Sequence, residues 1–138
     1  MKWFGTKIIV KTNGKGLIDF TSKVNDFIQK EKISNGICFL FIQHTSASLI
    51  LSENWDPSAK YDLEEFMNKL VPENQSWFKH IYEGSDDSPS HMRTMLTRSS
   101  ESIPIEHGKL DLGTWQGVYL FEHRTSPHNR KVIVKILA

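Results

Sequence analysis

Alternating hydrophobic and polar positions predict β-strands at both ends of the chain. Residues 3–12 alternate loosely and are rich in β-branched side chains, which favours a strand. Residues 37–42 form a continuous apolar run, typical of a strand buried on both faces, and residues 47–52 follow as another strand. The last third predicts strands at 101–105, 109–112, 117–123 and 131–137, with a hairpin turn at residues 106–108.

Helical spacing and capping residues predict two or three helices between these strands. Thr21 is expected to cap a first helix that ends at Asn35-Gly36. Asp56 followed by Pro57 is a strong helix start, and that second helix should end before Pro72. Its apolar stripe consists of Leu63, Phe66, Met67 and Leu70. A short third helix is expected from Asp87 or Ser88 to about Arg98.

The order of these elements indicates a fold class. Consecutive strands are joined by short turns, and parallel pairing would need long crossovers, so most pairing should be antiparallel. We therefore expect an α+β fold: a two-sheet, mostly antiparallel β-sandwich with two to three helices, formed by residues 1–138 as a single domain.

Composition narrows the class of protein further. Seventeen basic and sixteen acidic side chains give a net charge of +1, which predicts no nucleic-acid partner and no anionic membrane partner. The single cysteine, Cys38, lies in an apolar run and is expected to be buried, reduced and inert. No signal peptide or membrane-spanning run is visible, so a cytoplasmic location is expected.

Three polar clusters can carry chemistry. The first, residues 43–48, interrupts two apolar strands; His44 can bind a metal, and hydroxyls there can donate to phosphate or satisfy the backbone of a strand crossover. The second, residues 80–91, contains two histidines and several carboxylates. If Asp87 begins the third helix, His91 lies one turn further on the same face, a spacing that suits zinc and other first-row metals. The alternative is that Asp87 only caps the helix.

The third cluster covers residues 112–117 and 122–124. Two glycines bracket Thr114 and Gln116, which suggests a bulge or a close approach to a ligand. Glu122 and Arg124 end a strand and share a face, so Arg124 can clamp a phosphate or simply pair with the glutamate.

Taken in order, these clusters resemble the YjbQ-like family, often described as secondary thiamine-phosphate synthases. The family's motifs match as HTSAS…EN.DP at residues 44–57, H…EG.DD.PSH at 80–91 and LGTWQG…EHR at 112–124. Two departures are Ser88, where the family usually has Met, and the loop TSPHN after Arg124, which is usually glycine-rich. The resemblance implies a compact α+β sandwich that forms a homotrimer, with a histidine-lined site for a divalent metal, zinc or magnesium.

The resemblance also implies an activity: joining a pyrimidine diphosphate to a thiazole phosphate with release of pyrophosphate. On this hypothesis the metal ligands are His44, His80, Asp87 and His91. The small phosphorylated substrate is held by Thr45, Ser46, Thr114 and Gln116. Glu53 or Glu122 acts as general base or as an orienting group, and Arg124 neutralises the charge of the leaving pyrophosphate. The alternatives are a metal-dependent hydrolase of a small substrate and a non-catalytic trimer that binds a small ligand or a metal.

Overall fold

The computed structural model describes residues 1–138 and contains eight strands and three helices. Their order is β1 (Trp3–Asn13), β2 (Gly16–Asp19), α1 (Thr21–Lys30), β3 (Gly36–Ile42), β4 (Ala47–Glu53), α2 (Pro57–Leu70), α3 (Asp87–Leu96), β5 (Ser100–Glu106), β6 (Lys109–Leu110), β7 (Gln116–Glu122) and β8 (Pro127–Leu137). The expected strands and helices are all present. The short strand β2 was not expected, because its first residues read as a turn.

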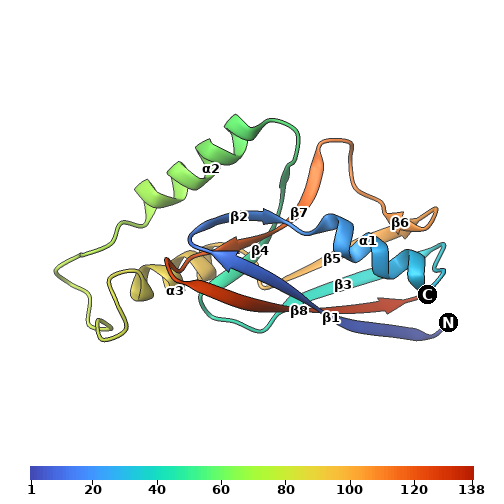
Figure 1. The fold of residues 1–138 in the computed structure, drawn as a ribbon, viewed down its shortest axis with the longest axis horizontal. Coiled ribbons are helices and arrows are strands. Elements are labelled where there is room, and N and C mark those ends of the chain that lie inside the picture. The colour runs from blue at the N-terminus through green and yellow to red at the C-terminus, as the bar shows by residue number, and fades with distance from the viewer.

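The strands form two sheets, and within each sheet every pair of neighbouring strands is antiparallel. One sheet has the order β1-β8-β3-β5-β6, and the other has the order β2-β7-β4. The main hydrophobic core draws on both sheets and on α1, whose Val24 and Ile28 are fully buried. The expected fold class, a two-sheet antiparallel sandwich with helices, is therefore confirmed (Figure 1).

The interior of strand β3 differs from the expectation. Cys38 is buried as expected, and burial raises the pKa of its thiol to about 12. The side chains of Ile37, Phe39 and Phe41, by contrast, are 46%, 38% and 48% exposed. The prediction of a strand buried on both faces is wrong, because only the inner face of the five-stranded sheet is covered by another layer.

Helix α2 begins where the sequence predicted, but only part of its apolar stripe is buried. Asp56 caps it by accepting a hydrogen bond from the backbone N–H of Ser58 at 2.9 Å. Met67 is buried, whereas Phe66 and Leu70 of the same stripe are 61% and 52% exposed. In Figure 1 the helix projects away from the sheets, and only Leu63 and Met67 of its stripe pack onto the three-stranded sheet, so the other half of the stripe has no surface to cover.

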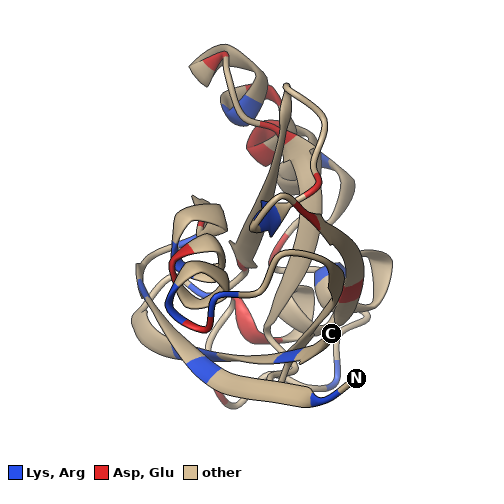
Figure 2. Ribbon diagram, turned by 90° about the vertical axis from the view of Figure 1, so that its right-hand side faces the viewer, with Lys and Arg blue, Asp and Glu red and all other residues tan.

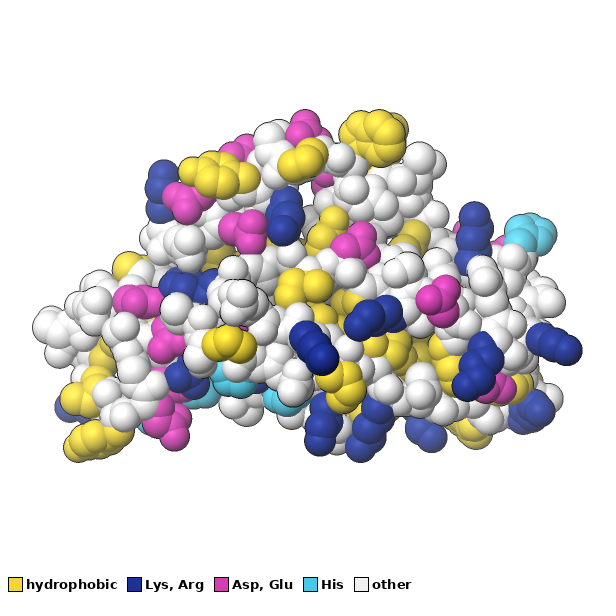
Figure 3. Space-filling view, viewed as in Figure 1, with side chains coloured by type: hydrophobic (Ala, Val, Ile, Leu, Met, Phe, Trp, Pro, Cys, Tyr) yellow, Lys and Arg dark blue, Asp and Glu magenta, His cyan; other side chains and the backbone are white.

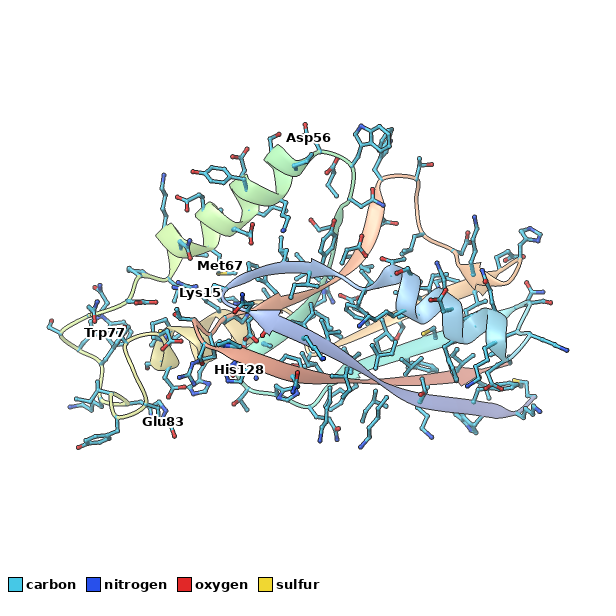
Figure 4. The ribbon with its side chains drawn as sticks, viewed as in Figure 1. Lys15, Asp56, Met67, Trp77, Glu83 and His128 are labelled. Carbon is cyan, nitrogen blue, oxygen red and sulfur yellow. The ribbon has the colours of Figure 1, made fainter.

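The remaining connections follow local rules. His107 and Gly108 both have positive φ, 51° and 79°, as a tight hairpin turn between β5 and β6 requires. Residues 71–86 join α2 to α3 without regular secondary structure, and Figure 4 shows Trp77 and Glu83 in this projecting segment. No helix has the length and apolar character needed to cross a membrane.

Candidate metal centre

The antiparallel pairing of β4 with β7 decides which polar clusters meet. Ala47 lies opposite Glu122 at one end of this pair, and Glu53 lies opposite Gln116 at the other end. Six residue steps separate the two ends, which is roughly 20 Å of extended strand. The first cluster and residues 122–124 therefore lie at one end, whereas Glu53 and residues 112–117 lie at the other. The second cluster joins the first end, because Arg124 binds Asp87 and the carbonyl oxygen of Thr45 contacts His91.

Three side chains at the convergent end form a group with metal-ligating atoms. One ligand atom from each of His80, Asp87 and His91 lies within 4.8 Å of the others. The Nε2 atom of His80 is 2.6 Å from Oδ2 of Asp87, and Nε2 of His91 is 3.3 Å from Oδ1. Asp87 is the first residue of α3, so His91 follows one turn later on the same face.

A backbone carbonyl orients the His91 ring. Its Nδ1 lies 2.8 Å from the carbonyl oxygen of Thr45, which can only accept a hydrogen bond. The ring proton therefore resides on Nδ1 in the neutral imidazole, and Nε2 presents a lone pair toward Asp87. Metal-binding histidines usually donate one ring N–H to a carbonyl or carboxylate and keep the other nitrogen for the metal, and His91 has this arrangement.

Asp87 is buried, and one of its oxygens is left unsatisfied. Its side chain is 1% exposed, and Oδ1 accepts a 2.8 Å hydrogen bond from Nη1 of Arg124. Its Oδ2 receives no well-directed hydrogen bond, although Nε2 of His80 lies close to it. A buried carboxylate oxygen without a donor costs about 1–3 kcal/mol, so this atom is suited to a cation.

Arg124 fixes the two aspartates at the start of α3. Its Nε donates to Oδ2 of Asp86 at 2.9 Å, and its Nη2 donates to the carbonyl oxygen of Glu83. Burial alone would lower the pKa of Arg124, but the hydrogen bond and charge of Asp86 raise it above the ordinary value. Each of its three nitrogens is bound to a protein oxygen, so the guanidinium holds the loop in place of the phosphate expected from the sequence.

Glu122 belongs to a buried ion pair beside the cluster. Its carboxylate accepts hydrogen bonds from Nε of Arg130 at 2.8 Å and from Oγ1 of Thr12 at 2.6 Å. Burial would raise the pKa of Glu122, but the Arg130 and Thr12 hydrogen bonds hold it below the usual range. Arg130 also donates to Oγ of Ser46 at 2.9 Å, so the pair fixes the strand crossover that carries Thr45.

Arg130 is a site residue that the sequence motifs did not predict, although its position in β8 carried a signal. Arg130 has the same parity as Val132, Val134 and Ile136 along β8, and all four are buried. A charged residue on the inward-facing side of a strand needs a buried partner, so alternation alone indicates that Arg130 pairs with an acid.

His44 lies near the three-residue group but is engaged elsewhere. Its Nε2 accepts a 2.8 Å hydrogen bond from the backbone N–H of Lys131, and its Nδ1 faces Arg130. Burial, together with the charge of Arg130, lowers the pKa of His44, which keeps the ring neutral. The structure thus does not bring His44 into the ligand set to which the sequence assigned it.

A shallow hollow of about 690 Å³ opens over the group. His80 and His91 line it together with His44, Thr45, Ser88, Thr94, Met95 and Ser99. Ser88, which replaces the family's usual Met, therefore contributes a hydroxyl to this wall. Met95 is the one hydrophobic residue among them, and an ion held by the group would face this hollow.

The other predicted site residues lie outside this centre. Glu53 accepts hydrogen bonds from the backbone N–H groups of Trp55 and Asp56, at 3.1 and 3.0 Å, and orders the entry to α2. Gln116 closes its own loop by accepting from the N–H of Gly113 at 2.8 Å, and Thr114 is exposed beside it. None of these three side chains lines the hollow.

His123 lies in the sequence next to the site residues Glu122 and Arg124, but its side chain is buried away from the hollow. His123 is 1% exposed, and its Nε2 is 2.9 Å from Oγ of Ser48, while its Nδ1 has no partner. Burial and the neighbouring charge of Arg93 lower the pKa of His123 to about 3, so its ring is neutral.

Comparison with known proteins gives a consistent family assignment. The family model described as UPF0047 protein YjbQ-like matches residues 6–138. A UPF0047 protein of Synechocystis is 49% identical over 94% of this chain and 88% of its own length. YjbQ of Escherichia coli is 35% identical over 97% of each chain. A solved YjbQ-like structure from Sulfolobus solfataricus covers 99% of this chain and 98% of its own, with a TM-score of 0.89 and 28% identity.

These comparisons correct the functional expectation. The relatives from Synechocystis and Escherichia coli are named only as UPF0047 proteins, and the Sulfolobus structure is described as a protein of unknown function. Nothing in them indicates thiamine-phosphate synthesis, hydrolysis or any other catalytic activity. The synthase expectation and its hydrolase alternative are therefore wrong on this evidence, and the catalytic roles assigned to Glu53, Glu122 and Arg124 lose their basis.

Proposed function

Since the chain belongs to the UPF0047 YjbQ-like family, whose relatives named above carry no assigned activity, we propose from its own geometry that it binds a first-row divalent metal ion. The ligands are Nε2 of His80, the carboxylate of Asp87 and Nε2 of His91. The observation that carries the proposal is the buried carboxylate of Asp87 with an imidazole nitrogen near each oxygen, His80 Nε2 at 2.6 Å from Oδ2 and His91 Nε2 at 3.3 Å from Oδ1.

The charge of the site favours a cation. Asp86 and Asp87 bring two negative charges, and Arg124 neutralises one of them through its contacts with both. Histidines bind a metal in their neutral form, so with both histidines as ligands the centre would keep one net negative charge next to the hollow. Arg124 would then hold the carboxylate in place, in the way that hydrogen bonds around a metal site orient its ligands.

The donor set selects among metals. Two imidazoles and one carboxylate suit zinc and neighbouring first-row ions, whereas magnesium prefers oxygen ligands alone. Of the two metals expected from the resemblance, the geometry favours zinc. Three protein ligands leave a coordination position open toward the hollow, where a water or a small anion would complete the ion's shell.

The test is zinc binding by the purified, tag-free protein, measured by calorimetry and by thermal melting. Zinc at 100 times its Kd would add about 2.7 kcal/mol to the free energy of unfolding, or roughly 8 to 10 °C in Tm for a chain of this size. His80→Ala removes an exposed side chain and His91→Ala a half-buried one, so both variants should fold yet lose this shift. His107→Asn, in the distant β5–β6 turn, is the matched control and should keep it.

Two results would contradict the proposal. One is zinc binding of unchanged affinity in both histidine variants, which would place the ion elsewhere. The other is the absence of any zinc-dependent shift in the unaltered protein at near-neutral pH.

A further inference from the structure

The outer face of the five-stranded sheet is an uncovered surface, separate from the metal centre. Side chains of one parity along β1, β8, β3 and β5 point away from the core, and no helix or strand covers them. We call this surface the open sheet face. Its large apolar members are Trp3, Ile9, Ile37, Phe39 and Phe41, all between 38% and 59% exposed.

The charges on the open sheet face are almost all positive. Its exposed strand positions include Lys7, Lys11, Lys131 and Lys135. The single acid of the same parity, Glu106, lies at the end of edge strand β5 opposite Lys109. Because the whole chain is nearly neutral, its acids are concentrated on other surfaces. Figure 3 shows Lys and Arg side chains gathered along the lower edge of the molecule, and Figure 2 shows them on the ribbon that leads to the N-terminus.

One point on this face combines stacking and charge. The rings of Trp3 and Phe39 have centroids 6.2 Å apart, and Lys135 lies directly across from Phe39 in the β3–β8 pairing. These three side chains line an open hollow of about 450 Å³. Gly5 lies opposite Lys135 in the β1–β8 pairing, and the absence of a side chain there gives the lysine room along the sheet.

We propose that the open sheet face binds single-stranded nucleic acid, with a base stacked on Trp3 and Phe39 and the adjacent phosphate on Lys135. Known single-strand-binding modules use this combination: RRM domains stack bases on aromatic rings of an exposed sheet, and basic side chains beside such rings bind the backbone. A second copy of the chain packed face to face about a two-fold axis would place lysines against lysines. The charge therefore favours an anionic partner, and the aromatic rings favour one with flat, stackable groups.

This inference is independent of the metal site and revises an expectation from composition. The net charge of +1 predicts no nucleic-acid partner only if the charges are evenly spread over the surface. Four lysines on one sheet face make a local field that the sum over the chain conceals.

The experiment is fluorescence anisotropy of a labelled oligothymidylate titrated with the full chain, from about 50 to 200 mM NaCl. Phe39→Ala should weaken binding roughly 5- to 150-fold without altering the salt dependence, because stacking involves no counterion release. Lys135→Gln should reduce the slope of log K against log salt by about 0.7, the value for one phosphate contact on a single strand.

Matched controls come from the exposed surface of α2. Tyr61→Ala removes an aromatic ring that is 64% exposed, and Lys60→Gln removes an exposed lysine, and neither should change binding. Thermal melting of each variant checks that the fold is retained.

Several outcomes would overturn the proposal. These are no binding of the oligonucleotide at the lowest salt, equal losses in the α2 controls, and tighter binding of duplex than of single strand. Binding to anionic vesicles without binding to the oligonucleotide would assign the face to lipid instead. Self-association that Phe39→Ala abolishes, again without oligonucleotide binding, would assign it to a second copy of the chain.

Discussion

Replacing Glu122 with glutamine tests how much the buried Glu122–Arg130 pair beside the metal centre contributes to the stability of the fold. The carboxylate receives the guanidinium of Arg130, the hydroxyl of Thr12 and the backbone N–H groups of His123 and Arg124. An uncharged amide of the same size keeps one oxygen but turns an N–H₂ group toward these donors. The Arg130 charge would then be buried without an opposite charge.

The burial of the pair sets the magnitude. The side chains of Glu122 and Arg130 are 0% and 4% exposed, so little solvent screens their interaction. Removing one partner of such a pair costs about 3–5 kcal/mol, mainly because the other charge is left uncompensated. That is a large part of the 5–15 kcal/mol typical of a whole domain, and it corresponds to roughly 10 to 20 °C in Tm for this chain length.

The assay is urea denaturation of both proteins at neutral pH, followed by circular dichroism. Glu73→Gln is the matched control, since Glu73 pairs with Lys15 at 2.7 Å but both side chains are more than a quarter exposed. That change should cost under about 1 kcal/mol. If Glu122→Gln cost no more than the control, the argument that this buried pair holds the crossover together would be refuted.

Three further changes address other parts of the fold. The free energy of unfolding should fall by about 3–5 kcal/mol as the pH drops from about 6.5 toward 3, because His123 takes up a proton in the unfolded chain but stays neutral when buried. In urea titrations across this pH range, His123→Phe should remove this contribution to the pH dependence of stability. Met67→Ala should cost about 2–3 kcal/mol, whereas Leu70→Ala on the same helix, half exposed, should cost under about 0.5 kcal/mol. Gly36→Ala would bring a Cβ to 2.5 Å from a backbone oxygen of β8 and should lower the Tm by several degrees, while Gly5→Ala meets only a flexible lysine and should change it little.

The strands and helices could be predicted because local pattern and capping agreed with the final packing. The start of α2 at Asp56-Pro57 and the turn at His107-Gly108 follow from the chemistry of single residues. The exposure of Phe39 and Phe41 could not be predicted in this way. A run of apolar residues looks the same in a strand covered on one face as in a strand covered on both, and coverage depends on which sheet the strand joins.

The candidate site was predicted in part for a similar reason. The spacing of Asp87 and His91 places both on one helix face, and the structure keeps them together with His80. The expectation that Glu53 and Gln116 would share the site failed, since the register of β4 against β7 places them at the far end of the pair. A sequence shows which residues are polar, but strand register decides which of them meet.

The strand order has a consequence for how the chain reaches its fold. Strand β8 is the last strand in chain order, yet it lies between β1 and β3 within the five-stranded sheet. Trp3 pairs with Leu137, so this contact closes a loop that spans almost the whole chain, and such long-range contacts slow folding. Until β8 is inserted, the unpaired edges of β1 and β3 are both exposed to other chains. Aggregation during synthesis should therefore be most acute before this strand emerges, and a chaperone that shields strand edges should protect the nascent chain at that stage.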